Sequence, residues 1–334
     1  MDPITHSLAA WALARAGGNR LAPQATATLV AAANIADLDY FYILGGAHAY
    51  LTHHLTWSHS ALAALVLGGG VALLFWWLGK ASQPLGPLLA AGWMGAASHL
   101  LLDWTTSAGT ELLWPASDTR YALDWFSFTE PALLFLLLLG LALPALFALI
   151  HEEIGARRSP RAPRWGAVVA LAALLGLAAA TASLHEEAVT QLDSRIYRDR
   201  TPLRSSAYPA PLNPYRWQGL VETDTTYEVV PVNLLNRQRP VEAFNTFYKP
   251  AASRALDRAL ATETAGIFLT WARFPHIEIV PAVGGGWHIR LQDLREVARR
   301  PGARRFLAWI ELTSELEVER EAILWGRPGE ESAR

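Results

Sequence analysis

Long apolar runs dominate the first 184 residues of the chain, and four of them are candidates for membrane-spanning helices. A hydrocarbon core of ~30 Å needs roughly 20 apolar residues in a helix, and Pro131–Ile150 and Trp165–Leu184 carry no charge over such a length. Ala61–Gly79 ends in a tryptophan pair typical of a membrane interface. Pro87–Asp103 is unusual because it contains a histidine and an aspartate. The pattern predicts a multi-pass helical membrane domain.

Two weaker apolar segments precede these runs. Ile4–Ala16 is too short to span a membrane alone, and Gln24–Leu44 contains Asp37 and Asp39. An ionised side chain inside a span costs several kcal/mol unless it is paired, hydrated or coordinated. Two interpretations stay open for this pair of segments, in which they either cross the membrane or form buried or re-entrant helices.

Basic residues orient the predicted spans, because loops rich in Lys and Arg stay in the cytoplasm. The loop between the last two spans contains Arg157, Arg158, Arg161 and Arg164. With this loop and Lys80 inside, His48–Ser60, Trp104–Glu130 and everything after Leu184 fall outside. We therefore expect the C-terminal region to face the extracytoplasmic side.

The character of the chain changes after Leu184. Arg200–Trp217 is rich in proline, serine and tyrosine, which favours a linker. Patterns typical of strands follow in Gly219–Val232, Gly266–Val280, Trp287–Leu291 and Arg305–Val318, and Ala251–Thr264 favours a helix. We expect a mainly α membrane-embedded domain at 1–184, a linker at 185–217 and a small α+β extracytoplasmic domain at 218–334.

Composition limits the chemistry that the chain can perform. Hydrophobic residues make up 52% and charged residues 17% of the 334 residues, which is more apolar than a typical soluble protein. The net charge of −2, without a basic patch interleaved with aromatic residues, gives no reason to expect a nucleic-acid partner. The chain has no cysteine, so disulfides, thiolate metal sites and cysteine nucleophiles are excluded. Any metal must therefore be bound by imidazole and carboxylate.

Histidines and aspartates gather at the ends of the apolar segments. Two of them, His99 and Asp103, are four residues apart and share one face of a helix. Under the topology above, the group lies at one level near the outward face, where a dication would neutralise the carboxylates. We interpret these residues as a metal site, with one of the adjacent His53 and His54 pointing to solvent. The group comprises His6, Asp37, Asp39, His53, His54, His59, His99 and Asp103.

Imidazole together with carboxylate suits Zn²⁺ best, and Mn²⁺, Fe²⁺ or Ni²⁺ less decisively. The group offers more than the four ligands of one ion, so it has room for one to three ions. Such a site lowers the pKa of bound water and polarises a phosphoryl or carbonyl oxygen. Asp37, Asp39 and Asp103 are the candidate general bases, if they are not fully committed to metal.

Four motifs resemble the YdjM-like family of inner-membrane-associated proteins, which are taken to be metal-dependent hydrolases. These motifs are Met1–His6, Ala36–Asp39, Thr56–Ser60 and Ser98–Trp104, and the match extends to Arg120-Tyr121, Asp124–Phe126 and Asn213–Trp217. The resemblance implies a metal cluster of His6, Asp37, Asp39, His54, His59, His99 and Asp103. The family is considered similar to zinc-dependent phospholipase C and single-strand nuclease folds, which implies hydrolysis of a phosphoester.

The chain departs from the family pattern at two positions. Leu55 stands where an arginine is usual, and Glu130 stands where an aspartate is expected. Leu55 removes a possible phosphate-binding cation. Both departures therefore bear on the substrate more than on the metal.

Three functions are compatible with these observations. The first is hydrolysis of a lipid-like or phosphorylated small molecule at the bilayer surface, with Arg120 or Arg216 as candidate phosphate ligands. The second is divalent-metal or proton-coupled transport, which is disfavoured because the ligands gather at helix ends near one face. The third is a structural membrane protein whose helices are joined by the metal. We expect the hydrolase, with the lipid bilayer as a partner and no nucleic acid.

Overall fold

The computed structural model describes residues 1–153, 162–210, 212–236, 245–282, 285–299, 303 and 305–326. The chain forms two compact units. Unit 1 comprises Met1–Asp39 and Leu55–Ser183, and unit 2 comprises Tyr40–His54 and Leu184–Arg334. The short segment Tyr40–His54 thus belongs to unit 2 although both of its neighbours in sequence belong to unit 1, and we call it the α3 excursion.

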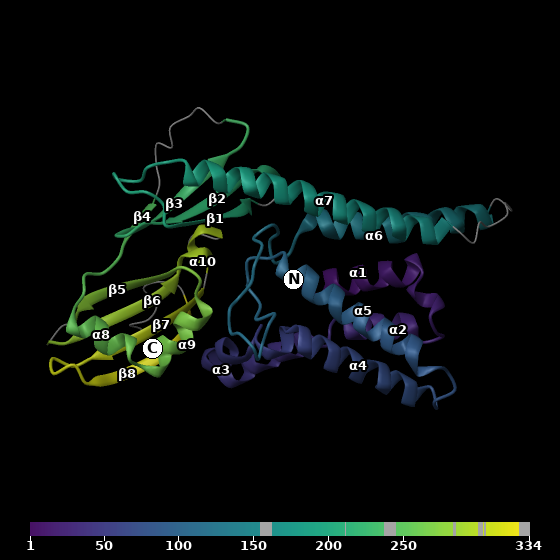
Figure 1. Cartoon of the computed structure of the whole chain (residues 1–334), viewed down its shortest axis with the longest axis horizontal. Coiled ribbons are helices and arrows are strands. Elements are labelled where there is room, and N and C mark those ends of the chain that lie inside the picture. The colour runs from purple at the N-terminus through teal and green to yellow at the C-terminus, as the bar shows by residue number, and fades with distance from the viewer. Residues whose placement is uncertain are drawn as a thin grey trace. The chain divides into compact units, whose positions relative to one another are not determined.

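Unit 1 is helical (Figure 1). Its α-helices are α1 (Pro3–Ala16), α2 (Ala25–Ala32), α4 (Ala61–Leu78), α5 (Leu85–Trp104), α6 (Pro131–Glu153) and most of α7 (Ala162–Asp193). Three 3₁₀ helices lie between them, η1 (Gly18–Arg20), η2 (Ala36–Gly45), which continues into the α3 excursion, and η3 (Trp57–His59).

Three helices among the described residues are long and apolar enough to cross a membrane, namely α4, α5 and Arg164–Asp193 of α7. The segment Ala36–His53 passes the same test together with α2, as a pair bent by 41°, which is the geometry of a broken span or a re-entrant loop. The apolar part of α6, Pro131–Phe147, is shorter. Helices therefore occupy all four predicted spans. The loop arginines Arg157, Arg158 and Arg161 lie outside the described residues, so the predicted orientation stays a prediction.

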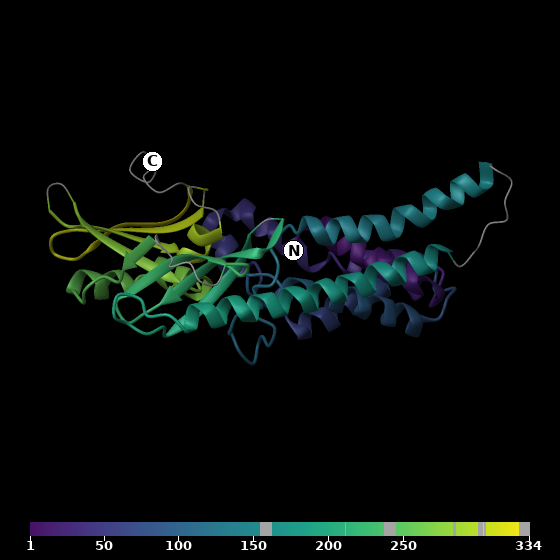
Figure 2. The ribbon, with the colours of Figure 1, turned by 90° about the horizontal axis from the view of Figure 1, so that it is seen from above.

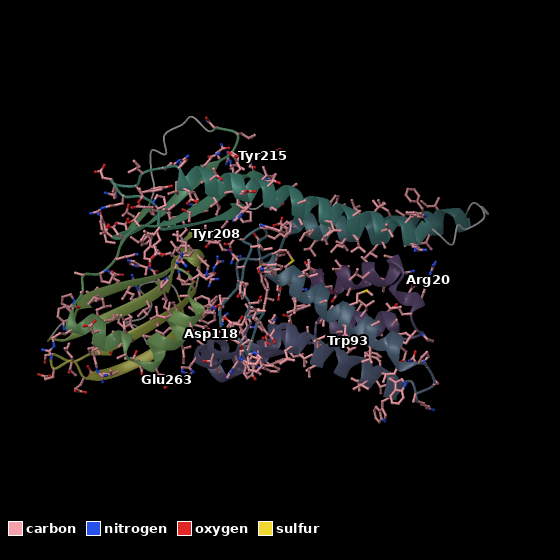
Figure 3. The ribbon with its side chains drawn as sticks, viewed as in Figure 1. Arg20, Trp93, Asp118, Tyr208, Tyr215 and Glu263 are labelled. Atoms are coloured by element: carbon pink, nitrogen blue, oxygen red, sulfur yellow. The ribbon has the colours of Figure 1, made fainter. Side chains whose placement is uncertain are left out.

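Glycines allow α4 and α5 to pack with their backbones in contact. A Cβ added at Gly92 would lie 2.2 Å from the carbonyl oxygen of Gly68, a distance that a side chain does not tolerate. Membrane helices associate closely where such small residues face each other. Trp93, which Figure 3 labels, donates a hydrogen bond of 3.0 Å from its indole to the carbonyl of Leu65 across the same pair of helices. Both contacts fix α5, which carries His99 and Asp103.

Unit 2 contains two four-stranded antiparallel sheets, each with its strands in sequence order (Figures 1 and 2). The first sheet consists of β1 (Arg204–Ala210), β2 (Asn213–Glu222), β3 (Thr226–Asn233) and β4 (Asn245–Tyr248). The second consists of β5 (Pro275–Pro281), β6 (Trp287–Asp293), β7 (Arg305–Leu312) and β8 (Val318–Gly326). The helices of this unit are α3 (Gly46–His53), α8 (Arg254–Leu260), α9 (Glu263–Trp271) and α10 (Leu294–Arg299).

The end of α7 packs on the first sheet (Figure 1). Leu192 is fully buried in a cluster with Trp217 and Val230. A Cβ at Gly219 would lie 2.5 Å from the side chain of Leu192, so a larger residue at this position on β2 would displace that side chain. One continuous helix therefore joins the apolar unit to the sheet unit.

The stretch that the sequence indicated as a linker contains strands instead. Helix α7 runs on to Asp193, and β1 and β2 occupy most of Arg200–Trp217. The prolines that favoured a linker are compatible with this structure, because Pro209 lies in the edge strand β1, where a missing N–H is tolerated.

Three of the predicted strand regions contain more than one element. Gly219–Val232 and Arg305–Val318 each include parts of two strands and the hairpin turn between them. In the turn between β2 and β3, the Thr223 hydroxyl accepts hydrogen bonds from the N–H groups of Thr225 and Thr226. Gly266–Val280 begins in helix α9 rather than in a strand. The hydroxyl of Thr262 caps this helix by accepting from the N–H of Ala265. The predicted mixture of helices and strands in this region is confirmed, but the prediction contained fewer strands than the structure has.

Candidate metal centre

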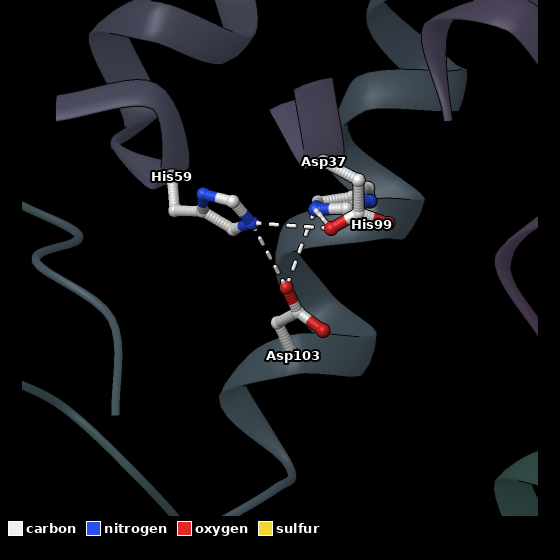
Figure 4. A group of neighbouring side chains, drawn as sticks. All are labelled: Asp37, His59, His99 and Asp103. Carbon is white, nitrogen blue, oxygen red and sulfur yellow. Dashed lines mark ion pairs between the residues drawn. The ribbon is translucent and has the colours of Figure 1, made fainter. Parts of the chain in front are cut away.

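Two aspartates and two histidines from three segments of unit 1 point toward one another (Figure 4). Asp37 lies at the start of η2, His59 ends η3, and His99 and Asp103 are one turn apart on α5. One ligand atom from each side chain lies within 4.8 Å of the others. His59, His99 and Asp103 are buried, and Asp37 is partly exposed. We call these four residues the metal cluster.

Nitrogen and oxygen atoms alternate around the centre of the metal cluster. His59 Nε2 lies 3.3 Å from Asp103 Oδ2 and 3.6 Å from Asp37 Oδ1. His99 Nε2 lies 3.2 Å and 3.8 Å from the same two oxygens. A tetrahedral shell with ligand atoms about 2.1 Å from the ion has separations of about 3.4 Å between ligand atoms. The four observed separations lie around this value.

The outer nitrogens of both imidazoles are bound to protein groups, and this contact sets their tautomers. His99 Nδ1 lies 2.9 Å from the carbonyl oxygen of Ala33, which can only accept, so Nδ1 carries the proton and Nε2 presents a lone pair. His59 Nδ1 lies 3.1 Å from Asp39 Oδ2, and a carboxylate selects the same tautomer. The Nε2 atoms of both rings face carboxylate oxygens at 3.2 to 3.8 Å, and in the neutral rings these atoms offer their lone pairs.

Several polar atoms of the metal cluster are buried without a hydrogen bond. Among the described residues, His99 Nε2, Asp103 Oδ2 and Asp37 Oδ2 have no hydrogen-bond partner. Leaving a buried donor or acceptor unsatisfied costs about 1–3 kcal/mol, and more for a charged group. A divalent cation accepts these lone pairs and balances the charge of the two carboxylates. The residues present therefore fit such an ion.

Asp39 lies behind His59 and does not itself join the metal cluster. Its Oδ2 accepts from the N–H of Leu55 at 3.1 Å and from the hydroxyl of Ser58 at 2.5 Å, in addition to contacting His59 Nδ1. Carboxylates that bind the outer nitrogen of a ligating histidine fix its ring orientation and raise its basicity. Asp37 and Asp39 are thus only two residues apart in sequence but have different positions in the site.

Helix α5 reaches the site because its backbone touches α2. A Cβ at Gly95 would lie 2.3 Å from the carbonyl oxygen of Leu29. Gly95, His99 and Asp103 follow one another at four-residue intervals, so one stripe of α5 packs on α2 and then enters the metal cluster. The same approach brings His99 Nδ1 to Ala33 at the end of α2.

The N-terminal motif borders the metal cluster. His6 Nε2 lies 3.2 Å from Asp103 Oδ1, and the His6 ring stacks on His99 at 4.0 Å between ring centroids. The amino group of Met1 forms an ion pair with the same Asp103 oxygen. Asp2 begins α1 by accepting from the N–H of Thr5 at 3.0 Å, which holds His6 one turn into the helix.

Residues 1–185 match the family described as YdjM inner membrane protein. The chain belongs to this family. The resemblance read from the sequence motifs is thereby confirmed, and the matched residues include the whole metal cluster. No curated protein and no solved structure matches the chain. Both sheets of unit 2 lie beyond the residues that match the YdjM family.

His54, the remaining ligand that the YdjM resemblance implied, lies in unit 2 at the end of the α3 excursion. Its ring stacks on Tyr50 at 4.4 Å and meets the ring of Tyr40 edge-on at 5.7 Å. The neighbouring His53 packs against Tyr42 at 4.5 Å. The metal-ligand role of His54 stays a prediction.

Two candidate phosphate ligands have different surroundings in this YdjM-family chain. The side chain of Arg120 is only 5% exposed and forms an ion pair of 3.3 Å with Glu111, whereas Arg216 is exposed on β2. Burial raises the pKa of Glu111, and the nearby Arg120 opposes this shift.

The sequence analysis missed two residues around the site. It missed Glu111 because no helical or strand spacing relates this residue to Arg120. It also missed Ser58, which supports Asp39, although Ser58 directly precedes His59.

Proposed function

We propose that this YdjM-family protein is a membrane-bound, metal-dependent hydrolase in which Asp37, His59, His99 and Asp103 bind a divalent cation. The observation that carries the proposal is the convergence of two imidazole Nε2 atoms and two carboxylates in a buried site, an arrangement that a divalent cation would satisfy. Imidazole with carboxylate and no thiolate favours Zn²⁺, with Mn²⁺ as the next choice.

A divalent cation bound at these residues would lower the pKa of a water molecule and polarise a phosphoryl or carbonyl oxygen. The protein's own groups prepare the site, since Asp39 orients His59 and the Ala33 carbonyl orients His99. Asp37 is the most exposed of the four ligands, with 19% of its side chain accessible against 0–2% for the others. It is therefore our choice for the group that would take a proton from water.

A phosphoester of a lipid or lipid-linked molecule is the substrate class that we propose. The metal cluster lies in the apolar helical unit of a chain from an inner-membrane protein family, and a lipid head group would reach a site there without leaving the bilayer. The expected likeness of the family to phospholipase C and nuclease folds suggested the same chemistry by analogy, and the proposal does not depend on it. The proposed placement of the site on the extracytoplasmic side follows from the arginine-rich loop.

Purified protein in lipid nanodiscs tests the proposal. We expect zinc-dependent release of phosphate or head group from at least one member of a phospholipid and lipid-phosphate panel. Asp103→Ala should lower turnover by more than about 100-fold, because loss of a ligand exceeds the 10–100-fold effect of losing an outer-shell partner. Asp118→Ala, at an exposed loop position, serves as the matched control.

Two other outcomes would contradict hydrolysis. Bound metal that raises thermal stability without turnover on the panel would favour a structural role. Zinc flux into liposomes without ester cleavage would favour transport. Thermal stability is measured on the nanodisc preparation, and zinc flux is measured on the same purified protein reconstituted into sealed liposomes.

A further inference from the structure

The chain leaves unit 1 between two groups of residues that build the metal site. Asp37 and Asp39 precede the α3 excursion, and His59 follows it. The excursion itself, Tyr40–His54, is part of unit 2. Whatever holds the excursion therefore acts on both sides of the metal site through covalent connections.

Helix α3 is an integral part of the hydrophobic core of the second sheet. Leu51 is only 2% exposed and belongs to one cluster with Phe268 of α9 and Ile323 of β8. The ring of Tyr50 stacks on Phe306 of β7 at 5.4 Å, with an angle of 24° between the planes. Truncating such a buried leucine leaves a cavity that the surrounding core fills only in part. The second sheet thus fixes the position of α3.

The two ends of the α3 excursion are tied together by the carboxylate that orients His59. Asp39 Oδ2 accepts from the N–H of Leu55, the first residue after the excursion, at 3.1 Å. Leu55 has a φ of 61°, in the left-handed region that is unfavourable for a residue with a Cβ. Its carbonyl accepts from the N–H of Glu111 at 3.3 Å. A shift of α3 would therefore pull on Leu55 and Asp39, and through Asp39 on the His59 ring.

We propose that unit 2 positions the metal site through α3, with Leu51 and Tyr50 as positioning residues. Packing of α3 into the second sheet holds Asp39 and Leu55 in register, and Asp39 then holds His59 with Nε2 directed at the metal cluster. The coupling is reciprocal, so metal binding in turn stabilises α3 in the sheet core. This inference rests on the proposed metal site, and it gives unit 2 a role in this chain.

The test compares Leu51→Ala with two matched variants of the full-length protein. Leu51→Met keeps the volume of the side chain and should behave as wild type. Leu220→Ala removes a fully buried leucine of β2 from a cluster that contains no residue of α3. Two quantities are measured on each protein, namely zinc affinity by competition with a chelator and hydrogen exchange of the amides of residues 55–60.

We expect Leu51→Ala to lower zinc affinity by at least about tenfold, the lower end of the effect of losing an outer-shell partner. It should also speed amide exchange at residues 55–60, while Leu51→Met and Leu220→Ala leave both quantities near wild type. Wild-type affinity and exchange in Leu51→Ala would overturn the inference, as would an equal loss in Leu220→Ala.

Two features keep this test decisive. Should Leu51→Ala not fold, Tyr50→Ala removes the stack on Phe306 at a less buried position, and the same results are expected of it. A wild-type protein that binds no zinc would refute the proposed function. The amide hydrogen exchange of residues 55–60 would still show whether α3 is coupled to the segment that carries His59. Exchange that responds to Leu51→Ala without metal supports the coupling, and exchange that does not respond overturns it.

Discussion

The substitution Gly95→Ala tests whether the contact between α5 and α2 holds the His99 side chain in its position in the metal cluster. The added Cβ would lie 2.3 Å from the carbonyl oxygen of Leu29 and 3.0 Å from the Cβ of Ala32, whereas ordinary contact begins at 3.4 Å. Helix α5 would therefore have to move by roughly 1 Å. Overpacking of this kind costs about 1–3 kcal/mol, while exchanging glycine for alanine in a helix gains about 0.5–1 kcal/mol. The net loss of stability should reach about 2 kcal/mol.

The same shift should disturb the metal site more than the fold. The hydrogen bond from His99 Nδ1 to the Ala33 carbonyl is 2.9 Å long, and moving α5 by roughly 1 Å would take it beyond the usual 2.7–3.2 Å. His99 would then lose the contact that fixes its tautomer and ring plane. We expect zinc affinity to fall by about tenfold or more, as for the loss of other outer-shell partners.

Gly86→Ala is the matched control, because Gly86 lies at the start of the same helix and an added Cβ meets nothing within 4 Å. Thermal unfolding in detergent and zinc titration are measured on wild type and both variants. Gly86→Ala should unfold at or slightly above the wild-type temperature, with unchanged affinity. If Gly95→Ala matched Gly86→Ala in both measurements, the contact between α2 and α5 would not be what positions His99.

Three further perturbations have defined outcomes. Removing metal with a chelator should lower the free energy of unfolding by about 2.7 kcal/mol if the metal was present at 100 times its Kd, as followed by calorimetry. Asp39→Asn should lower zinc affinity 10–100-fold, because His59 loses its orienting carboxylate, and the exposed Asp118→Asn should not. Burial lowers the pKa of His276 below its ordinary value of 6.5, so the folded state binds fewer protons and stability falls as the pH drops below 6.5. His276→Gln should weaken this pH dependence of unfolding relative to His288→Gln.

Each of these outcomes can be contradicted by the same data. Unfolding that is insensitive to chelation would mean that no metal contributes to the fold. Equal zinc affinities of Asp39→Asn and Asp118→Asn would show that the carboxylate behind His59 is dispensable. An unchanged pH dependence in His276→Gln would assign the acid sensitivity of unit 2 to other groups.

The helical unit could be predicted from sequence because its signals are local. Apolar runs of span length became α4, α5 and the apolar part of α7, and the four-residue spacing of His99 and Asp103 placed both on one face of α5. The meeting of these two residues with Asp37 and His59 also followed from a local argument, since each stood at the end of an apolar segment. Burial of polar groups in apolar surroundings is a signal that a single sequence carries.

The different positions of Asp37 and Asp39 could not be predicted. Both precede the α3 excursion with similar neighbours, and only the path of the backbone through η2 decides which side chain faces the metal cluster. The excursion itself was also missed, because Leu51 packs with Phe306, more than 250 residues away in sequence. No periodic pattern within Tyr40–His54 indicates a partner so distant.

The metal content of the purified protein tests the central claim most directly. Wild type, His59→Ala and Asp103→Ala are prepared identically and analysed by inductively coupled plasma mass spectrometry. The account predicts at least about one divalent ion per wild-type chain and a small fraction of that in either variant, because each variant removes a ligand of the same site. Equal metal content in all three proteins, or none in the wild type, would contradict it.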